Sequence, residues 1–192
     1  MLTHGAGGNC HAKLLVALSN AFAQTGFVVL RCDLPFRQSR PHGPPFPAMA
    51  ARDRDGLRRA VDFLRQKTSG KLFLGGHSYG GRQATMLAAD HPELADGLLL
   101  LSYPLHPPRK PTELRTAHFP KLHTRALFIH GGRDPFGSQG EMNSAINLIA
   151  AETRLLELEG AGHDLAGRNS TNELPARIVA AFQEFFGAPL PT

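Results

Sequence analysis

The sequence KLFLGGHSYGG at residues 71–81 places a G-x-S-x-G motif, Gly76 to Gly80, directly after a short apolar run. A helical pattern of apolar residues follows from Tyr79 to Asp90. This strand, turn and helix context is what the motif needs, because the serine occupies a strained turn and flanking glycines let backbones approach where a Cβ would clash. Residues 71–81 therefore predict a fold of the α/β class, with Ser78 as candidate nucleophile.

Outward from this motif, short apolar runs alternate with longer segments of helical period. The predicted strands are Phe27–Arg31, Leu72–Gly75, Gly97–Leu101, Ala126–His130 and Arg154–Leu158. The predicted helices are His11–Gln24, Met49–Gln66, Tyr79–Asp90, Gln139–Ala151 and Glu173–Phe186. Such alternation is typical of a mostly parallel sheet with helices on both faces. A chain of 192 residues with 42% hydrophobic content is long enough for one core, so we expect a single domain, residues 1–192.

The first residues, Met1-Leu2-Thr3, have the pattern of the last part of a strand that runs into the His4-Gly5 turn. No residues before Met1 complete that strand. We therefore expect either a clipped start or an unusually small sheet of about six strands, with the first strands missing.

Composition favours a cytoplasmic protein. The formal net charge of +5 is spread over the chain and forms no single basic run, so nucleic-acid binding is not expected. Two cysteines, Cys10 and Cys32, without a CxxC pair, fit a reducing compartment. We expect neither export nor membrane association, because no basic segment precedes an apolar stretch and no apolar run approaches 18 residues.

A serine nucleophile requires a base and an acid later in the chain, and both follow predicted strands. Asp134 lies in a loop after the run Ala126–His130, and His163 lies in a loop after Leu155–Leu158. The order serine, aspartate, histidine is the one expected for this kind of sheet, with all three groups at the carboxyl ends of strands. We predict Ser78, Asp134 and His163 as a catalytic triad.

Acyl transfer also needs N–H donors for the developing oxyanion. Tyr79 follows the nucleophile and supplies one backbone N–H. The loop His4-Gly5-Ala6-Gly7-Gly8 resembles the HG-containing oxyanion loop, and Ala6 is its predicted donor. Arg37 is expected to line the same cleft. The ten histidines include no HExxH pattern, so we predict no metal site.

Several of these motifs together resemble the α/β-hydrolase superfamily, specifically its small, lidless, dienelactone-hydrolase-like branch. Within that branch the chain is similar to a group that includes a chromatin acetyltransferase complex subunit and its bacterial relatives. The motifs that carry the resemblance are His4-Gly5-Ala6-Gly7-Gly8, Gly75–Gly81, Tyr103-Pro104-Leu105-His106-Pro107-Pro108 and Gly132-Arg133-Asp134-Pro135-Phe136. The resemblance implies an α/β-hydrolase fold, the triad above and no cofactor. Residues 105–125 are too few for a cap domain, so we expect an open site.

The resulting hypothesis is a serine hydrolase, a carboxylesterase that cleaves short, soluble acyl esters through an acyl-enzyme. Amide or peptide hydrolysis by the same triad is an alternative, because the preference for a leaving group depends on pocket shape. A non-catalytic interaction module is a further alternative, because fold does not fix function. The sequence leaves the natural substrate and the oligomeric state open.

Overall fold

The computed structural model describes residues 1–165 and 173–187. Its six-stranded sheet has the order β2-β1-β3-β4-β5-β6, and every pair of neighbouring strands is parallel. The strands are β1 (Leu2–Thr3), β2 (Arg31–Cys32), β3 (Phe73–His77), β4 (Gly97–Leu101), β5 (Ala126–Gly131) and β6 (Thr153–Leu158). The central strands are buried on both faces, which is why β4 reads Gly-Leu-Leu-Leu-Leu without alternation.

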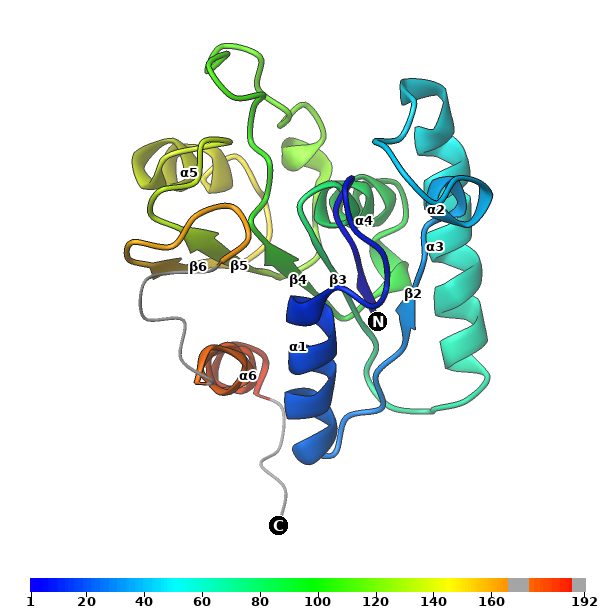
Figure 1. The fold of residues 1–192 in the computed structure, drawn as a ribbon. Helices are drawn as coiled ribbons and strands as arrows, with labels where there is room; N and C mark the ends of the chain where they lie inside the picture. Colours follow the sequence, from blue (N-terminus) through cyan, green and yellow to red (C-terminus); the bar gives the residue numbers. More distant parts are fainter. Residues whose placement is uncertain (166–172, 188–192) are drawn as a thin grey trace.

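In the described part of the chain, six α-helices cover the two faces of this sheet (Figure 1). They are α1 (Lys13–Gln24), α2 (Pro35–Ser39), α3 (Ala50–Arg65), α4 (Tyr79–Asp90), α5 (Gln139–Ile146) and α6 (Leu174–Phe186). Apolar side chains of α1 and α6 form one core cluster, and those of α3, α4 and α5 form another on the opposite face. Among the described residues, no helix is both long and apolar enough to cross a bilayer.

The predicted fold class is confirmed, but several element boundaries differ. The strand predicted at Phe27–Arg31 is wrong in position, since β2 covers only Arg31 and Cys32. The reason is that β1 has two residues and offers register partners only to these two. The helix α2 was not predicted, because its five residues are too short to show a helical period.

Two further differences concern where elements end. The α5 helix stops at Ile146 instead of Ala151, because tight turns at Leu148 and Ile149 return the chain to β6. The β3 strand continues to His77, where it still pairs with Leu101 of β4. The segment between β4 and β5 contains one short 3-10 helix, Phe119–Lys121, and within the described residues no cap domain covers the carboxyl edge.

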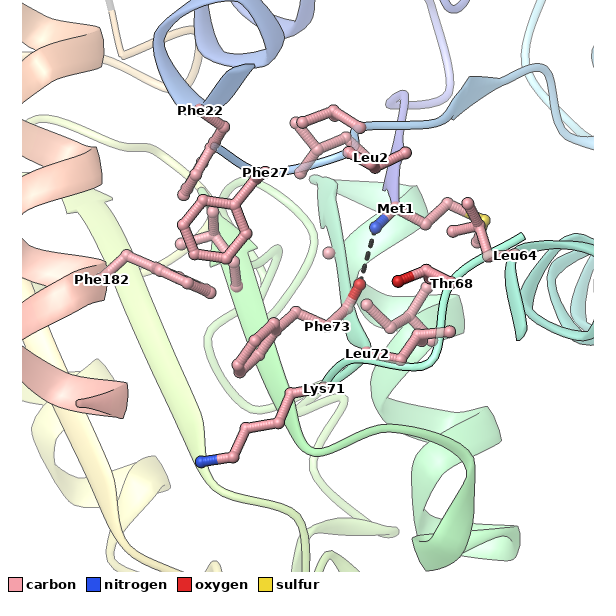
Figure 2. Close-up of a pocket in the computed structure, with 15 residues that line it drawn as sticks. Met1, Leu2, Phe22, Phe27, Leu64, Thr68, Lys71, Leu72, Phe73 and Phe182 are labelled. Atoms are coloured by element: carbon pink, nitrogen blue, oxygen red, sulfur yellow. Dashed lines mark hydrogen bonds between the residues drawn. The ribbon is translucent and has the colours of Figure 1, made fainter. Parts of the chain in front are cut away.

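The amino end of the sheet holds the chain terminus. The Met1 ammonium donates a hydrogen bond to the Phe73 carbonyl at 2.7 Å, and burial lowers the pKa of this amine to about 6 (Figure 2). An apolar cavity of about 60 Å³ adjoins it, with Phe22, Phe27 and Phe182 in its wall. This cavity lies at the beginning of β3, whereas Ser78 follows the end of the same strand.

Candidate active site

Ser78 occupies the turn between β3 and α4. Its φ angle of 51° lies in the left-handed region, which a residue with a Cβ adopts only under strain. The turn is held in place because the Ser78 N–H donates to the Leu101 carbonyl of β4 at 2.8 Å. The geometry places the serine at the carboxyl edge of the sheet, as the motif predicts.

Glycines around this turn are required by close backbone contacts. A Cβ on Gly76 would lie 2.7 Å from the Gly80 carbonyl carbon, and a Cβ on Gly80 would lie 2.6 Å from the His4 carbonyl oxygen. Real Cβ atoms do not approach other atoms so closely. The glycines of the motif therefore bring α4 against β1 and the loop that follows β1.

The structure joins Ser78, His163 and Asp134 in one chain of hydrogen bonds. Ser78 Oγ lies 2.8 Å from His163 Nε2, and His163 Nδ1 lies 2.8 Å from Asp134 Oδ2. An ionised carboxylate only accepts hydrogen bonds, so the imidazole proton is on Nδ1 and the Nε2 lone pair accepts the serine proton. This tautomer is the one that a general base for Ser78 requires.

The two loops that carry the acid and the base are neighbours because β5 and β6 pair along their whole length. Asp134 has a fully buried side chain, and its Oδ1 accepts the Phe136 N–H at 2.9 Å. The Phe136 ring packs on the His163 imidazole with centroids 4.2 Å apart. Asp134 and His163 are thus both fixed by contacts outside the three residues. Asp164, the other acid near His163, is exposed and does not replace Asp134 as the partner of Nδ1.

His77 is a site residue that the sequence analysis did not identify. Its Nε2–H donates to the His163 backbone carbonyl at 2.8 Å, and the two rings lie 5.3 Å apart. Burial is the main cause that lowers its pKa below the ordinary range, so the ring is neutral near pH 7. Its Nδ1 then lies unprotonated against Gly5, where a Cβ would come within 2.9 Å. His77 therefore connects the loop of the base with the loop after β1.

A second histidine lies behind the acid. His130, at the end of β5, is fully buried and donates from Nε2 to the Gly137 carbonyl at 2.6 Å. Its Nδ1 lies 3.9 Å from Asp134 Oδ2. Its place at the end of an apolar strand was the only signal in the sequence, and that place is equally typical of a core histidine.

The loop after β1 is a tight turn in which the Gly8 N–H donates to the Gly5 carbonyl at 3.1 Å. His4 supports the same carbonyl through Nδ1–H at 2.8 Å, while its Nε2 accepts the Leu34 N–H at 3.0 Å. Burial of the ring lowers the pKa of His4, which keeps the ring neutral for both contacts.

The Gly5 carbonyl and the Ala6 N–H belong to one planar peptide unit and point in opposite directions. The support of the carbonyl by His4 therefore orients the Ala6 N–H. Tyr79 is the first residue of α4, where an N–H has no intrahelical acceptor. The backbone hydrogen bonds of residues 1–165 and 173–187 include no carbonyl partner for the Ala6 or the Tyr79 N–H. Both groups are free to donate to a ligand.

The cleft beside Ser78 has a volume of about 720 Å³. The polar groups in its wall include His77, His163, Asp164 and Lys13. Its other lining residues are mostly apolar or glycine: Gly5, Ala6, Gly7, Gly8, Ala12, Leu14, Leu15, Phe136, Leu165 and Leu174, with His4 and Ser78 completing the wall. Arg37 does not belong to this wall, contrary to expectation; it is 6% exposed and lies beneath the turn after β1.

Neither metal ligands nor reactive thiols gather at this cleft. Within residues 1–165 and 173–187, no group of three or more His, Cys, Asp or Glu side chains is arranged to hold a metal ion. Both cysteines are free thiols. Burial raises the pKa of Cys32 to about 11 and also raises that of Cys10, so both are protonated near neutral pH.

The fold is similar to solved structures at 16 to 20% sequence identity. Dienelactone hydrolase from Anabaena variabilis aligns over 98% of this chain and 85% of its own, with 20% identity and a TM-score of 0.74. A serine hydrolase without a lid from Xanthomonas campestris, at 16% identity, aligns over 100% of this chain and 82% of its own, with a TM-score of 0.72.

Est1E from Butyrivibrio proteoclasticus, solved with ferulic acid bound, has 16% identity and a TM-score of 0.77, over 97% of this chain and 88% of its own. These likenesses concern the fold. At the level of sequence, residues 1–186 match the profile of the family described as an alpha/beta hydrolase domain, so this chain belongs to that family and is a hydrolase.

Proposed function

We propose that this protein is a serine carboxylesterase that cleaves short acyl esters through an acyl-enzyme. The observation that carries this proposal is the hydrogen-bond chain from Asp134 through His163 to Ser78, with both distances at 2.8 Å. These distances already match those of an activated nucleophile and its base. The buried carboxylate adds the group that stabilises the imidazolium formed during the reaction.

In the first half of the reaction, Ser78 Oγ attacks the ester carbonyl while its proton passes to His163 Nε2. The carbonyl oxygen becomes an oxyanion that accepts hydrogen bonds from the Ala6 and Tyr79 N–H groups. Collapse of this intermediate breaks the ester bond, and His163 gives its proton to the leaving alkoxide. The products of this half are the alcohol and an acyl group on Ser78.

In the second half, water attacks the acyl carbonyl while His163 Nε2 takes one of its protons. The tetrahedral intermediate again uses the two N–H donors. Its collapse releases the carboxylic acid and returns the proton to Ser78 Oγ. The enzyme is regenerated without any cofactor in this sequence of steps.

The preference for short acyl esters rests on the shape of the cleft. No cap covers the carboxyl edge in the described residues, and the walls are largely apolar with Leu14, Leu15 and Leu165 among them. An open apolar cleft suits a small, neutral ester more than a long chain that needs an enclosed tunnel. Amide hydrolysis by the same groups is the second candidate, since the triad geometry serves both leaving groups.

The test is hydrolysis of p-nitrophenyl acetate and butyrate by the wild type, Ser78→Ala and Ser102→Ala. Ser102 is a matched control, because it also follows a central strand with positive φ but is fully buried. We expect activity that is lost only in Ser78→Ala, and fluorophosphonate labelling at Ser78 by peptide mapping. Hydrolysis of the p-nitroanilides of acetic and butyric acid tests the amide alternative. A folded wild type that neither turns over esters nor labels would support a non-catalytic interaction module instead.

A further inference from the structure

Arg37, in α2, extends beneath the loop after β1, and every hydrogen bond of its guanidinium goes to a backbone carbonyl. The guanidinium also lies over the Phe36 ring, with Cζ 4.9 Å from the ring centroid. Its Nε donates to the Gly8 carbonyl at 2.8 Å, and its Nη2 donates to the Ala6 carbonyl at 2.8 Å. The remaining donors reach the Gly43 carbonyl and the Arg40 carbonyl, each at 3.0 Å. One guanidinium thus holds the turn that carries Ala6 and ties it to the segment after α2.

A buried cation normally has a carboxylate partner, because an unpaired charge is costly to remove from water. None of the lysine or arginine ion pairs in the described part of the chain includes Arg37. The buried carboxylate of Asp53 accepts hydrogen bonds from the Phe36 N–H and the Tyr79 hydroxyl and does not pair with Arg37. The four carbonyls, together with the face of the Phe36 ring, therefore compensate the buried charge of Arg37.

The contacts of Arg37 complete the restraint on Ala6. The peptide unit before the Ala6 Cα is held through the Gly5 carbonyl by His4 and by the Gly8 N–H. The peptide unit after the Ala6 Cα is held through the Ala6 carbonyl by Arg37. Since the backbone has only two soft dihedrals at each residue, fixing both flanking planes fixes the direction of the Ala6 N–H.

The arrangement also suits arginine in particular. A guanidinium is planar and presents five N–H donors in a fixed fork, whereas an ammonium is a single point with three rotatable donors. The two contacts to the Ala6 and Gly8 carbonyls use Nη2 and Nε, which form one edge of that fork. A lysine at position 37 could reach one of these carbonyls but could not hold both at the same geometry.

We propose that Arg37 is a positioning residue that fixes the oxyanion loop, residues 5–8, so that the Ala6 N–H is aimed at the oxyanion before substrate binds. This inference rests on the proposed function, because it assigns Ala6 as an oxyanion donor. Preorganised donors stabilise charge that develops only in the transition state. Loss of the orientation should therefore lower kcat and leave KM nearly unchanged.

The test compares Arg37→Lys with Arg40→Lys, a matched control on the same segment whose guanidinium is exposed and contacts the Pro44 carbonyl at 3.5 Å. We expect Arg37→Lys to lower kcat for p-nitrophenyl butyrate about 10- to 100-fold, approaching the loss of one oxyanion donor. Its KM should stay within about threefold, and Arg40→Lys should match the wild type. In Arg37→Ala, guanidinium added below denaturing concentration should restore part of kcat.

Hydrogen exchange of the peptide that covers residues 4–12 gives a second readout that does not depend on turnover. In Arg37→Lys we expect faster exchange there, with the exchange of β4 and β5 unchanged. Equal kcat and equal exchange in Arg37→Lys and wild type would overturn the proposal, as would a loss seen only in KM. A wild type without esterase activity or serine labelling would instead refute the proposed function, and exchange in the loop would still show whether Arg37 orders it.

Discussion

Replacement of Asp134 by asparagine is the most informative change at this site, because the structure fixes how the new side chain must lie. Asp134 Oδ1 accepts the Phe136 N–H at 2.9 Å, and Oδ2 faces His163 Nδ1 at 2.8 Å. In Asp134→Asn, the amide oxygen must remain on the Phe136 N–H, since an NH2 group there would place two donors against each other. The amide NH2 then faces His163 Nδ1 and donates to it.

This donation reverses the tautomer of the base. His163 Nδ1 becomes the acceptor, so the imidazole proton moves to Nε2, which then cannot take the proton of Ser78. A triad with the wrong tautomer loses about 10⁴-fold in kcat, which corresponds to about 5 kcal/mol of transition-state stabilisation. Because Asn has the size and shape of Asp, the buried contacts remain and KM should change little.

The assay is p-nitrophenyl butyrate hydrolysis at saturating substrate, with thermal unfolding as a check that the variant is folded. Asp164→Asn is the control, because it changes the acid next to His163 in sequence. Asp164 borders the cleft but is not the partner of His163 Nδ1, so Asp164→Asn should lose far less activity than Asp134→Asn. If Asp134→Asn kept more than about a tenth of kcat, the tautomer argument would be wrong. Equal losses in both variants would also refute the assignment of Asp134.

Three further outcomes follow from other contacts. Burial and the charge of Arg82 lower the pKa of His118 from 6.5 to about 4. Between these two pH values the unfolded chain binds more protons than the folded chain, so stability falls as the pH drops from 6.5 to 4. Denaturant unfolding should show a loss of ~2 kcal/mol over this range after a discount for solvent screening, and His118→Gln should remove most of this pH dependence. Gly80→Ala would press a Cβ against the His4 carbonyl at 2.6 Å and should cost about 1–3 kcal/mol in unfolding, whereas Gly7→Ala, with open space around its Cβ, should be neutral. His77→Ala removes the hydrogen bond to the His163 carbonyl and should lower kcat about tenfold, with partial recovery in His77→Gln. A wild-type kcat in His77→Ala would show that this hydrogen bond does not position His163.

The sheet could be predicted from the sequence because its strands carry the signal themselves. β4 and β5 are runs of large apolar residues bounded by turns, and their burial on both faces leaves few alternatives. The edge strand β2 was harder to predict. The run Phe27–Leu30 has the composition of a strand, yet pairing depends on the length of its neighbour, and β1 offers only Leu2 and Thr3.

The proximity of Ser78, Asp134 and His163 could also be predicted, because each of them follows a predicted strand. Parallel strands bring their carboxyl ends to one edge, so position in the chain implies proximity in space. His77 and His130 also lie at the ends of predicted strands, but that position alone does not indicate what either ring contacts. Each ring donates a hydrogen bond to a loop carbonyl, of His163 and Gly137 respectively, and carbonyl directions are not encoded in residue type.

Arg37 shows the same limit most clearly. The prediction placed Arg37, which follows Asp33-Leu34-Pro35-Phe36, in the wall of the cleft. Its actual partners, including the Ala6 and Gly8 carbonyls, become acceptors only once the turn after β1 has formed with those oxygens facing inward. The folded loop therefore creates the binding site for the guanidinium, and the bound guanidinium restrains the loop. Because of this mutual dependence, a change at Arg37 should perturb the oxyanion loop even though Arg37 lies 29 positions from Gly8 and 31 from Ala6 in the chain. Residue type alone could not reveal the link.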